Sequence, residues 1–118
     1  MLSQMIPPGV YLARGATDMR KKIDSLAAIV AGQFRLDVMS GSWFVFCNAG
    51  RDKLKILYFE GNGFWLYYRR LERGRFRWPA SGDSDTIQVT SRELRWLLDG
   101  LSIEQSQAHR PVFATAIV

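Results

Sequence analysis

The feature that most constrains the fold is a Gly-Asn-Gly turn between two runs rich in β-branched and aromatic residues. Residues 53–60 (KLKILYFE) and 64–71 (FWLYYRRL) are each long enough for a strand, and Asn62-Gly63 is a strong hairpin signal. A third run, 42–48 (SWFVFCN), precedes them. Because short links join antiparallel neighbours, the sequence predicts an antiparallel meander from residue 42 to about residue 78.

The residues before the meander predict a strand and a helix. VYLARG (10–15) follows a Pro-Pro-Gly break and is typical of a short strand. Thr17 suits a helix N-cap, with Asp18 in the first turn, and the predicted helix spans roughly 18–33. Its apolar face, at helical spacing, comprises Met19, Ile23, Leu26, Ala27, Val30 and Phe34.

The residues after the meander predict a loop at 79–85, a short strand at 86–90 and a second helix. Thr90 and Glu93 form a capping-box pattern, and Gly100 suits the helix end. Its apolar residues are Leu94, Leu97, Leu98 and Leu101. The chain is thus expected to be α+β, with an antiparallel sheet of about four to five strands and two helices packed on one face.

The domain expected from this pattern is a single α+β unit over residues 1–101, followed by a tail at 102–118. The tail ends in the apolar, strand-like run PVFATAIV. Such an edge is usually covered, so the run is expected either to add to a sheet, of this chain or of a neighbour, or to stay disordered outside a complex. A homo-oligomer is therefore one of the open alternatives.

The charge balance favours an anionic partner. The chain has a net charge of +5 and a pI near 9.8, which suits nucleic acid more often than a membrane surface, although plain solubility is the alternative. No apolar run approaches the ~20 residues of a membrane span, and the N-terminus lacks the pattern of a secretory signal. With one cysteine and no internal disulfide, the sequence predicts a cytoplasmic protein without a membrane partner.

The residue types needed for catalysis or metal binding are scarce. His109 and Cys47 are the one histidine and the one cysteine, and they are interpreted as a surface residue and a core residue. No phosphate-binding GxxxxGK[ST] loop occurs. Most of the acidic residues fit turns, caps or solvated faces rather than a convergent two-metal set. The sequence therefore predicts no enzyme activity, no metal and no cofactor.

The strongest functional signal is the stretch YYRRLERGRFRWP (67–79), in which five arginines are offset by one acid, Glu72. In a continuous strand the odd positions would share one face and carry rings followed by guanidinium groups, and Gly74 is where a bulge would shift that parity. Guanidinium groups suit phosphates, and rings suit bases. The alternative is that Trp65 and Tyr67 are core and that the arginines pair with Glu72 and Glu60.

The order of four segments makes the chain resemble a known family. GATDMRKKIDSLA (15–27), FVFCN (44–48), RDKLKILYFEGNGFWLYYRRLERGRFRWP (51–79) and VTSRELRWLLDGL (89–101) occur in this order. The chain resembles the TnpB-type accessory protein, the second-reading-frame product, of the insertion-sequence-66 family of bacterial transposable elements. It departs from that pattern at Ala49-Gly50, where similar proteins often carry basic residues, and at Lys22, where glycine is common.

The resemblance implies a non-catalytic accessory role in DNA transposition, beside a transposase that is a separate product of the element. We expect the chain to bind element DNA, the transposase, or both; the alternative is an interaction module that docks on the transposase without touching DNA. The expected anion-binding residues are Arg69, Arg70, Arg73, Arg75, Arg77, Lys53 and Lys55, with Trp65 and Tyr67 as contact rings. Arg20 and Lys21 form a second basic patch.

Overall fold

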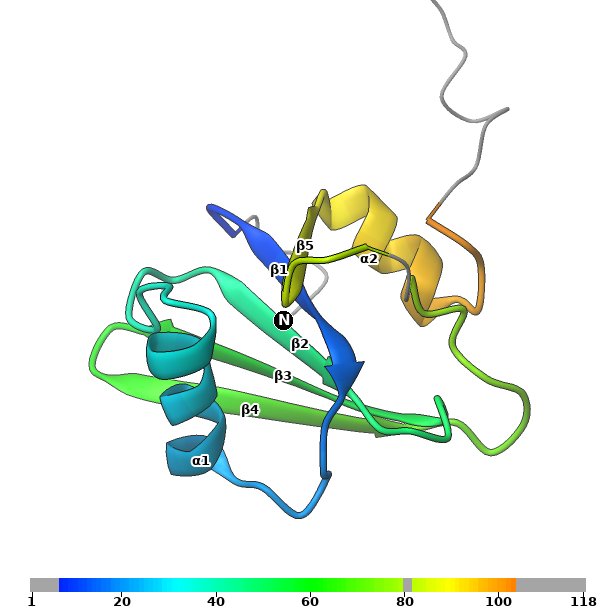
Figure 1. Ribbon diagram of the computed structural model, residues 1–118, viewed down its shortest axis with the longest axis horizontal. Coiled ribbons are helices and arrows are strands. Elements are labelled where there is room, and N and C mark those ends of the chain that lie inside the picture. The colour runs from blue at the N-terminus through cyan, green and yellow to red at the C-terminus, as the bar shows by residue number, and fades with distance from the viewer. Residues whose placement is uncertain (1–6, 80–81, 104–118) are drawn as a thin grey trace, which may run out of the picture.

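Five strands form one sheet in the computed structural model, which describes residues 7–79 and 82–103 (Figure 1). The order across the sheet is β4-β3-β2-β1-β5. The strands are β1 (Val10–Ala16), β2 (Trp43–Cys47), β3 (Lys53–Glu60), β4 (Gly63–Arg70) and β5 (Thr86–Val89). The meander of β2, β3 and β4 and the flanking strands agree with the sequence prediction, whereas the segment 71–78 is not a strand.

The sheet is mixed, so the prediction of a purely antiparallel sheet is wrong. β1 pairs with β2 in parallel, while β1–β5, β2–β3 and β3–β4 are antiparallel. The link from β1 to β2 contains α1 (Ile23–Ala28) and the π-helix η2 (Ile29–Gln33). A helical crossover of this length carries the chain from the end of β1 back to the edge of the sheet at which β1 began. β2 starts at that edge, so the two strands run in the same direction.

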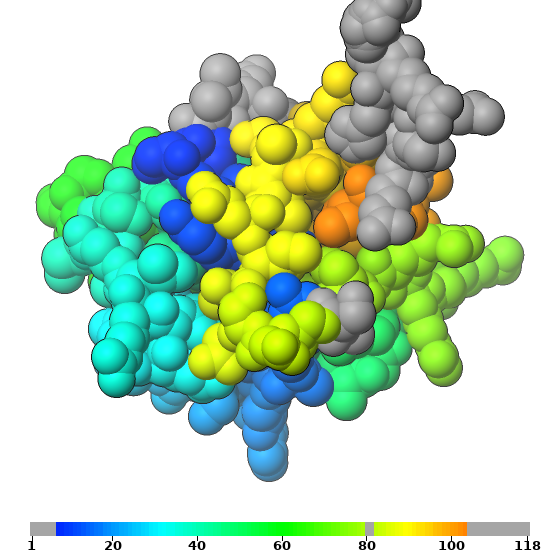
Figure 2. Space-filling view, turned by 45° about the horizontal axis from the view of Figure 1, so that its top comes forward, coloured from blue at the N-terminus to red at the C-terminus, as the bar shows by residue number. Residues whose placement is uncertain are grey.

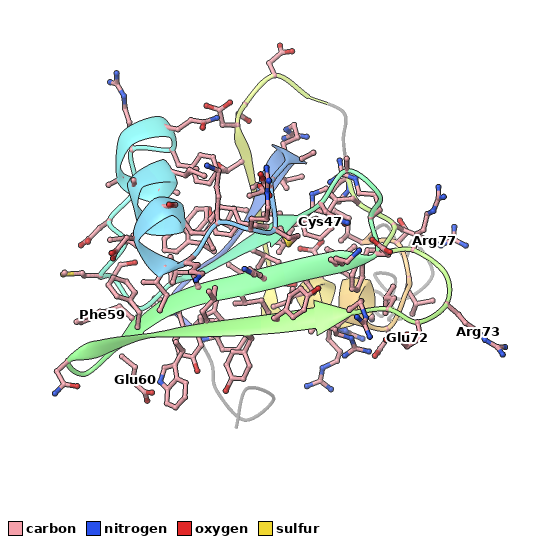
Figure 3. The ribbon with its side chains drawn as sticks, turned by 90° about the horizontal axis from the view of Figure 1, so that it is seen from below. Cys47, Phe59, Glu60, Glu72, Arg73 and Arg77 are labelled. Atoms are coloured by element: carbon pink, nitrogen blue, oxygen red, sulfur yellow. The ribbon has the colours of Figure 1, made fainter. Side chains whose placement is uncertain are left out.

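The helices lie on opposite faces of the sheet, not on one face as the sequence analysis expected. Leu26 of α1 and Val30 of η2 pack in one core cluster with Phe44 and Phe46 of β2. On the other face, α2 (Ser91–Leu98) packs in a cluster that contains Val45. All five residues of β2 are buried, because a strand with apolar side chains on both faces needs a cover on each (Figure 3).

The first helix begins later than predicted. Its N-cap is Lys22 rather than Thr17, and residues 18–21 form a turn. The carboxylate of Asp18 accepts a hydrogen bond from the Arg20 backbone N–H at 2.9 Å, and this local bond competes with helix formation. The helical segment still ends at residue 33, with Leu26 and Val30 fully buried and Ile23 half-buried.

The hairpin between β3 and β4 is shifted by one residue from the predicted turn. Glu60 pairs with Gly63, so the loop consists of Gly61 and Asn62. The positive φ falls on Gly61, at 65°, and not on Asn62, which is the pattern of a type II′ turn.

The capping box of α2 is confirmed. The Glu93 N–H donates to Thr90 Oγ1 at 3.0 Å, and the Thr90 N–H donates to Glu93 Oε1 at 2.8 Å. At the other end, Gly100 has φ 83°, and the Leu101 N–H donates to the Trp96 carbonyl. These contacts satisfy helix-end groups that would otherwise lack partners. The run PVFATAIV lies outside the described residues, and the proposed division at residue 101 stays a prediction.

Candidate nucleic-acid interface

The segment 71–78 crosses one end of the sheet from β4 to β1. The Leu71 N–H donates to the Asp52 carbonyl at 2.8 Å, and the Phe76 N–H donates to the Arg51 carbonyl at 2.7 Å. Further along, Trp78 Nε1 donates to the Ala13 carbonyl of β1 at 2.8 Å. The segment therefore follows the end at which β4 stops and β3 starts, and light-green atoms of this part of the chain project from one side of the molecule in Figure 2.

Buried and exposed side chains alternate along RFRW (75–78). Phe76 is buried and Trp78 is half-buried, whereas Arg75 and Arg77 are exposed. Gly74 has φ 76°. This turn separates Arg75 and Arg77 from β4, so the arginines do not form one continuous strand face. They are instead spread around the same end of the sheet.

Four exposed arginines at this end have guanidinium groups with no hydrogen bond or ion pair to the described residues: Arg69, Arg73, Arg75 and Arg77. Arg70 differs, because its Nε lies 3.0 Å from Glu72 Oε2 and the hydrogen bond to Glu72 raises the pKa of Arg70. Figure 3 shows Arg73 and Arg77 projecting from one end of the molecule, whereas Phe59 and Glu60 lie at the opposite end.

Arg51 is a structural residue of this end that the sequence analysis did not single out. It has φ 61°, and its guanidinium carbon lies 5.8 Å from the centroid of the Trp78 ring. Its Nη1 is buried and has no hydrogen-bond partner among the described residues. Beside it, Cys47 is fully buried, as the interpretation of a small core residue expected, and burial raises the pKa of its thiol.

The two predicted lysines lie on the face opposite to Arg69. Lys53 is directly paired with Arg70 and Lys55 with Tyr68, and paired residues of antiparallel strands point to the same face. Lys53 Nζ lies 3.6 Å from Asp52 Oδ1. Lys55 Nζ donates to the carbonyls of Met19 and Lys21, at 2.7 and 2.9 Å, so it fixes the 18–21 turn. This contact makes Lys55 a structural residue.

The two predicted rings share the face of Arg69: Tyr67 lines a pocket of about 240 Å³ together with Arg69, whereas Trp65 lies nearer the hairpin. Trp65 is 50% exposed, and its Nε1 donates to Glu60 Oε1 at 2.7 Å. Its ring is stacked with that of Tyr67 at 6.3 Å between centroids, and Tyr67 is stacked with the buried Tyr58 at 6.0 Å. Four residues of strand, about 13 Å, separate Trp65 from Arg69. The structure therefore does not bring Trp65 together with the arginines.

The second basic patch meets the first at the end of the sheet. An open hollow of about 610 Å³ is lined by Asp18, Arg20, Lys53 and Tyr68 together with the turn at 48–50. Arg20 Nη2 lies 2.7 Å from Asp18 Oδ2, and this hydrogen bond lowers the pKa of Asp18 to about 2. Lys21 borders a separate hollow beside Gln33.

We call this surface the basic end. It comprises Arg20, Lys53, Arg69, Arg70, Arg73, Arg75 and Arg77.

Within residues 7–79 and 82–103, no three His, Cys, Asp or Glu side chains gather in a group that could hold a metal ion. No helix within these ranges has the length and apolar character needed to cross a bilayer.

Comparison with known proteins places the chain among products of mobile elements. The profile of the IS66 Orf2-like proteins matches residues 9–108. The uncharacterized protein y4hO of Sinorhizobium fredii (strain NBRC 101917 / NGR234) is 36% identical over 107 residues, which cover 87% of this chain and 92% of that protein. The uncharacterized protein y4jC of the same strain is 28% identical over 105 residues, or 86% and 89% of the two chains. No solved structure matches this chain.

Proposed function

Because the chain belongs to the IS66 Orf2-like family, we propose that it is a non-catalytic accessory protein of an insertion sequence that binds DNA through the basic end. Membership of the family supports the accessory role in the element. The contact with the DNA backbone is the additional step that the charge distribution supports.

The observation that carries this proposal is the set of four exposed arginines without carboxylate partners among the described residues. Residues 69–78 contain five arginines and one acidic residue, Glu72, which accepts a hydrogen bond from Arg70. A single surface arginine needs no partner in a stable fold. Several like charges at one end of the molecule repel one another, however, and this repulsion favours the binding of a polyanion. A guanidinium fork matches the geometry of a phosphate group.

The anchoring of the segment 71–78 also suits this role. Phe76 is buried in the core, and Trp78 is hydrogen-bonded to β1, so the backbone that carries Arg75 and Arg77 is held against the sheet. Only the long side chains remain to be ordered when a phosphate binds. Less conformational entropy is then lost on binding than if the whole segment had to fold.

The proposal is tested by the salt dependence of binding to a labelled random duplex, measured by fluorescence anisotropy. Four phosphate contacts give a slope of log affinity against log salt of about −3.6, at about −0.9 per contact. Changing Arg75 and Arg77 together to Ala should flatten the slope by roughly 2 and weaken binding to unrelated sequences alike.

A matched control changes Arg92 and Arg95 of α2 to Ala, which removes the same charge from exposed positions outside the basic end. The slope of this control should stay that of the wild type. If both double variants shift the slope equally, the effect is one of net charge and the basic end is not the binding surface.

A further inference from the structure

The exposed aromatic ring that borders residues of the basic end is Tyr68, not Trp65. Tyr68 is 53% exposed and borders the hollow of about 610 Å³, together with Arg20 and Lys53. Trp65 is similarly exposed, at 50%, but its indole is bonded to Glu60 near the hairpin. The two rings also point to opposite faces of β4, because their positions differ by an odd number of residues.

The ring of Tyr68 is held by a lysine that is itself fixed. Lys55 Nζ lies 5.7 Å from the centroid of the Tyr68 ring, within the range of a cation–π contact. The same ammonium group donates to the carbonyls of Met19 and Lys21. A ring supported in this way loses little side-chain freedom when a second flat group stacks on it.

The positive charges beside the ring are available to phosphates. Lys53 and Arg70 face each other across β3 and β4 on the same side of the sheet as Tyr68. Their ion pairs with Asp52 and Glu72 are at the surface, and such pairs contribute little free energy. A phosphate oxygen can therefore replace the carboxylate at small cost.

We propose that this face binds a single-stranded stretch of DNA, with one base stacked on Tyr68 and neighbouring phosphates on Lys53 and Arg70. The inference rests on the proposed function, because it assumes that the basic end meets DNA. A single strand is the ligand that fits, because a ring can stack only on a base whose face is free, and in a duplex both faces are covered by neighbouring bases.

The experiment compares an oligothymidylate of about 12 nucleotides with a random duplex, by anisotropy at about 50 mM salt. Tyr68→Leu keeps an apolar side chain but removes the ring, and Tyr68→Phe keeps the ring. The Leu variant should bind the single strand on the order of 10- to 100-fold more weakly, while its duplex affinity changes less than about twofold. The Phe variant should bind both as the wild type does.

Trp65→Leu is the matched control, since it removes an equally exposed ring from the other face of β4. It should leave single-strand affinity unchanged. Equal losses in the Tyr68→Leu and Trp65→Leu variants, or no loss in either, would overturn the stacking inference while duplex binding still supported the proposed function. Absence of binding to both probes by the wild type would instead defeat the proposed function and this inference with it.

Discussion

Trp78 anchors the arginine segment to the sheet, so Trp78→Phe tests whether this anchor contributes to stability. The substitution keeps an aromatic ring but removes the N–H that donates to the Ala13 carbonyl at 2.8 Å. Ala13 is 3% exposed and lies where the register between β1 and β2 shifts. Its carbonyl would lose this donor in a place that water hardly reaches.

The expected cost follows from that geometry. A buried acceptor left without its partner destabilises a fold by about 1–3 kcal/mol. The contact of Arg51 with the indole, at 5.8 Å, adds a smaller loss because a phenyl ring attracts a cation less strongly. We expect the free energy of unfolding to fall by about 1–3 kcal/mol in total.

The assay is urea unfolding followed by circular dichroism, with Arg77→Ala as the control. Arg77 is exposed and one residue from the anchor, so its loss should change stability by less than about 0.5 kcal/mol. A change below about 0.5 kcal/mol for Trp78→Phe as well would refute the idea that the indole anchors the segment.

Three further substitutions test the fold and one of its charges. Leu26→Ala should cost about 2–5 kcal/mol in urea melts, because Leu26 of α1 is fully buried against the sheet, and a loss below about 1 kcal/mol would show that this face is not core. Thr90→Ala should cost about 0.5–2 kcal/mol by removing the cap of α2, and an unchanged melt would contradict the capping box. Asp18 has a lowered pKa of about 2, so its contribution to stability is present above about pH 4 and is lost as the pH falls toward 2. In Asp18→Asn, the free energy of unfolding should fall less between about pH 4 and pH 2 than in the wild type. If the variant and the wild type lose stability equally over this range, the contact of Asp18 with Arg20 is not maintained in solution.

The elements of this fold were predictable from local patterns, whereas their arrangement depended on contacts between distant residues. The hairpin, the capping box and the buried face of the first helix all rest on spacing within a few residues. The late start of α1 depends on more than local spacing, because Lys55, 36 residues from Met19, binds the carbonyls of the 18–21 turn in addition to the local bond between Asp18 and Arg20. A helix-capping rule uses only neighbouring residues. It therefore placed Asp18 in the first helical turn without including the contact of Lys55 with this turn.

Two errors in the predicted sheet had signals in the sequence. The run WFVFC is apolar at every position, which indicates a strand covered on both faces and hence helices on both sides. The long helical link between β1 and β2 likewise favours a parallel pair. The prediction extended the antiparallel pairing of the hairpin to the whole sheet. The hairpin determines how β3 pairs with β4, but it does not determine the direction of β1.

The candidate site was predictable in composition but not in shape. The sequence predicted that Phe76 and Trp78 alternate with Arg75 and Arg77. It also indicated that the chain could change direction at Gly74. The path of the segment across the sheet end depends on the bond from Trp78 to Ala13, 65 residues away. That path turns Arg73, Arg75 and Arg77 away from the line of β4, whereas Tyr68 borders the hollow lined by Arg20 and Lys53.

The central claim, that the basic end binds DNA, is tested most directly by the affinity of the wild-type chain for duplex DNA at about 50 mM salt, where phosphate contacts are strongest. We expect measurable binding to the ends of the element and to random duplex, weakening steeply as salt is raised. No detectable binding to either duplex at that salt concentration would contradict the claim and favour a protein that docks on the transposase without touching DNA.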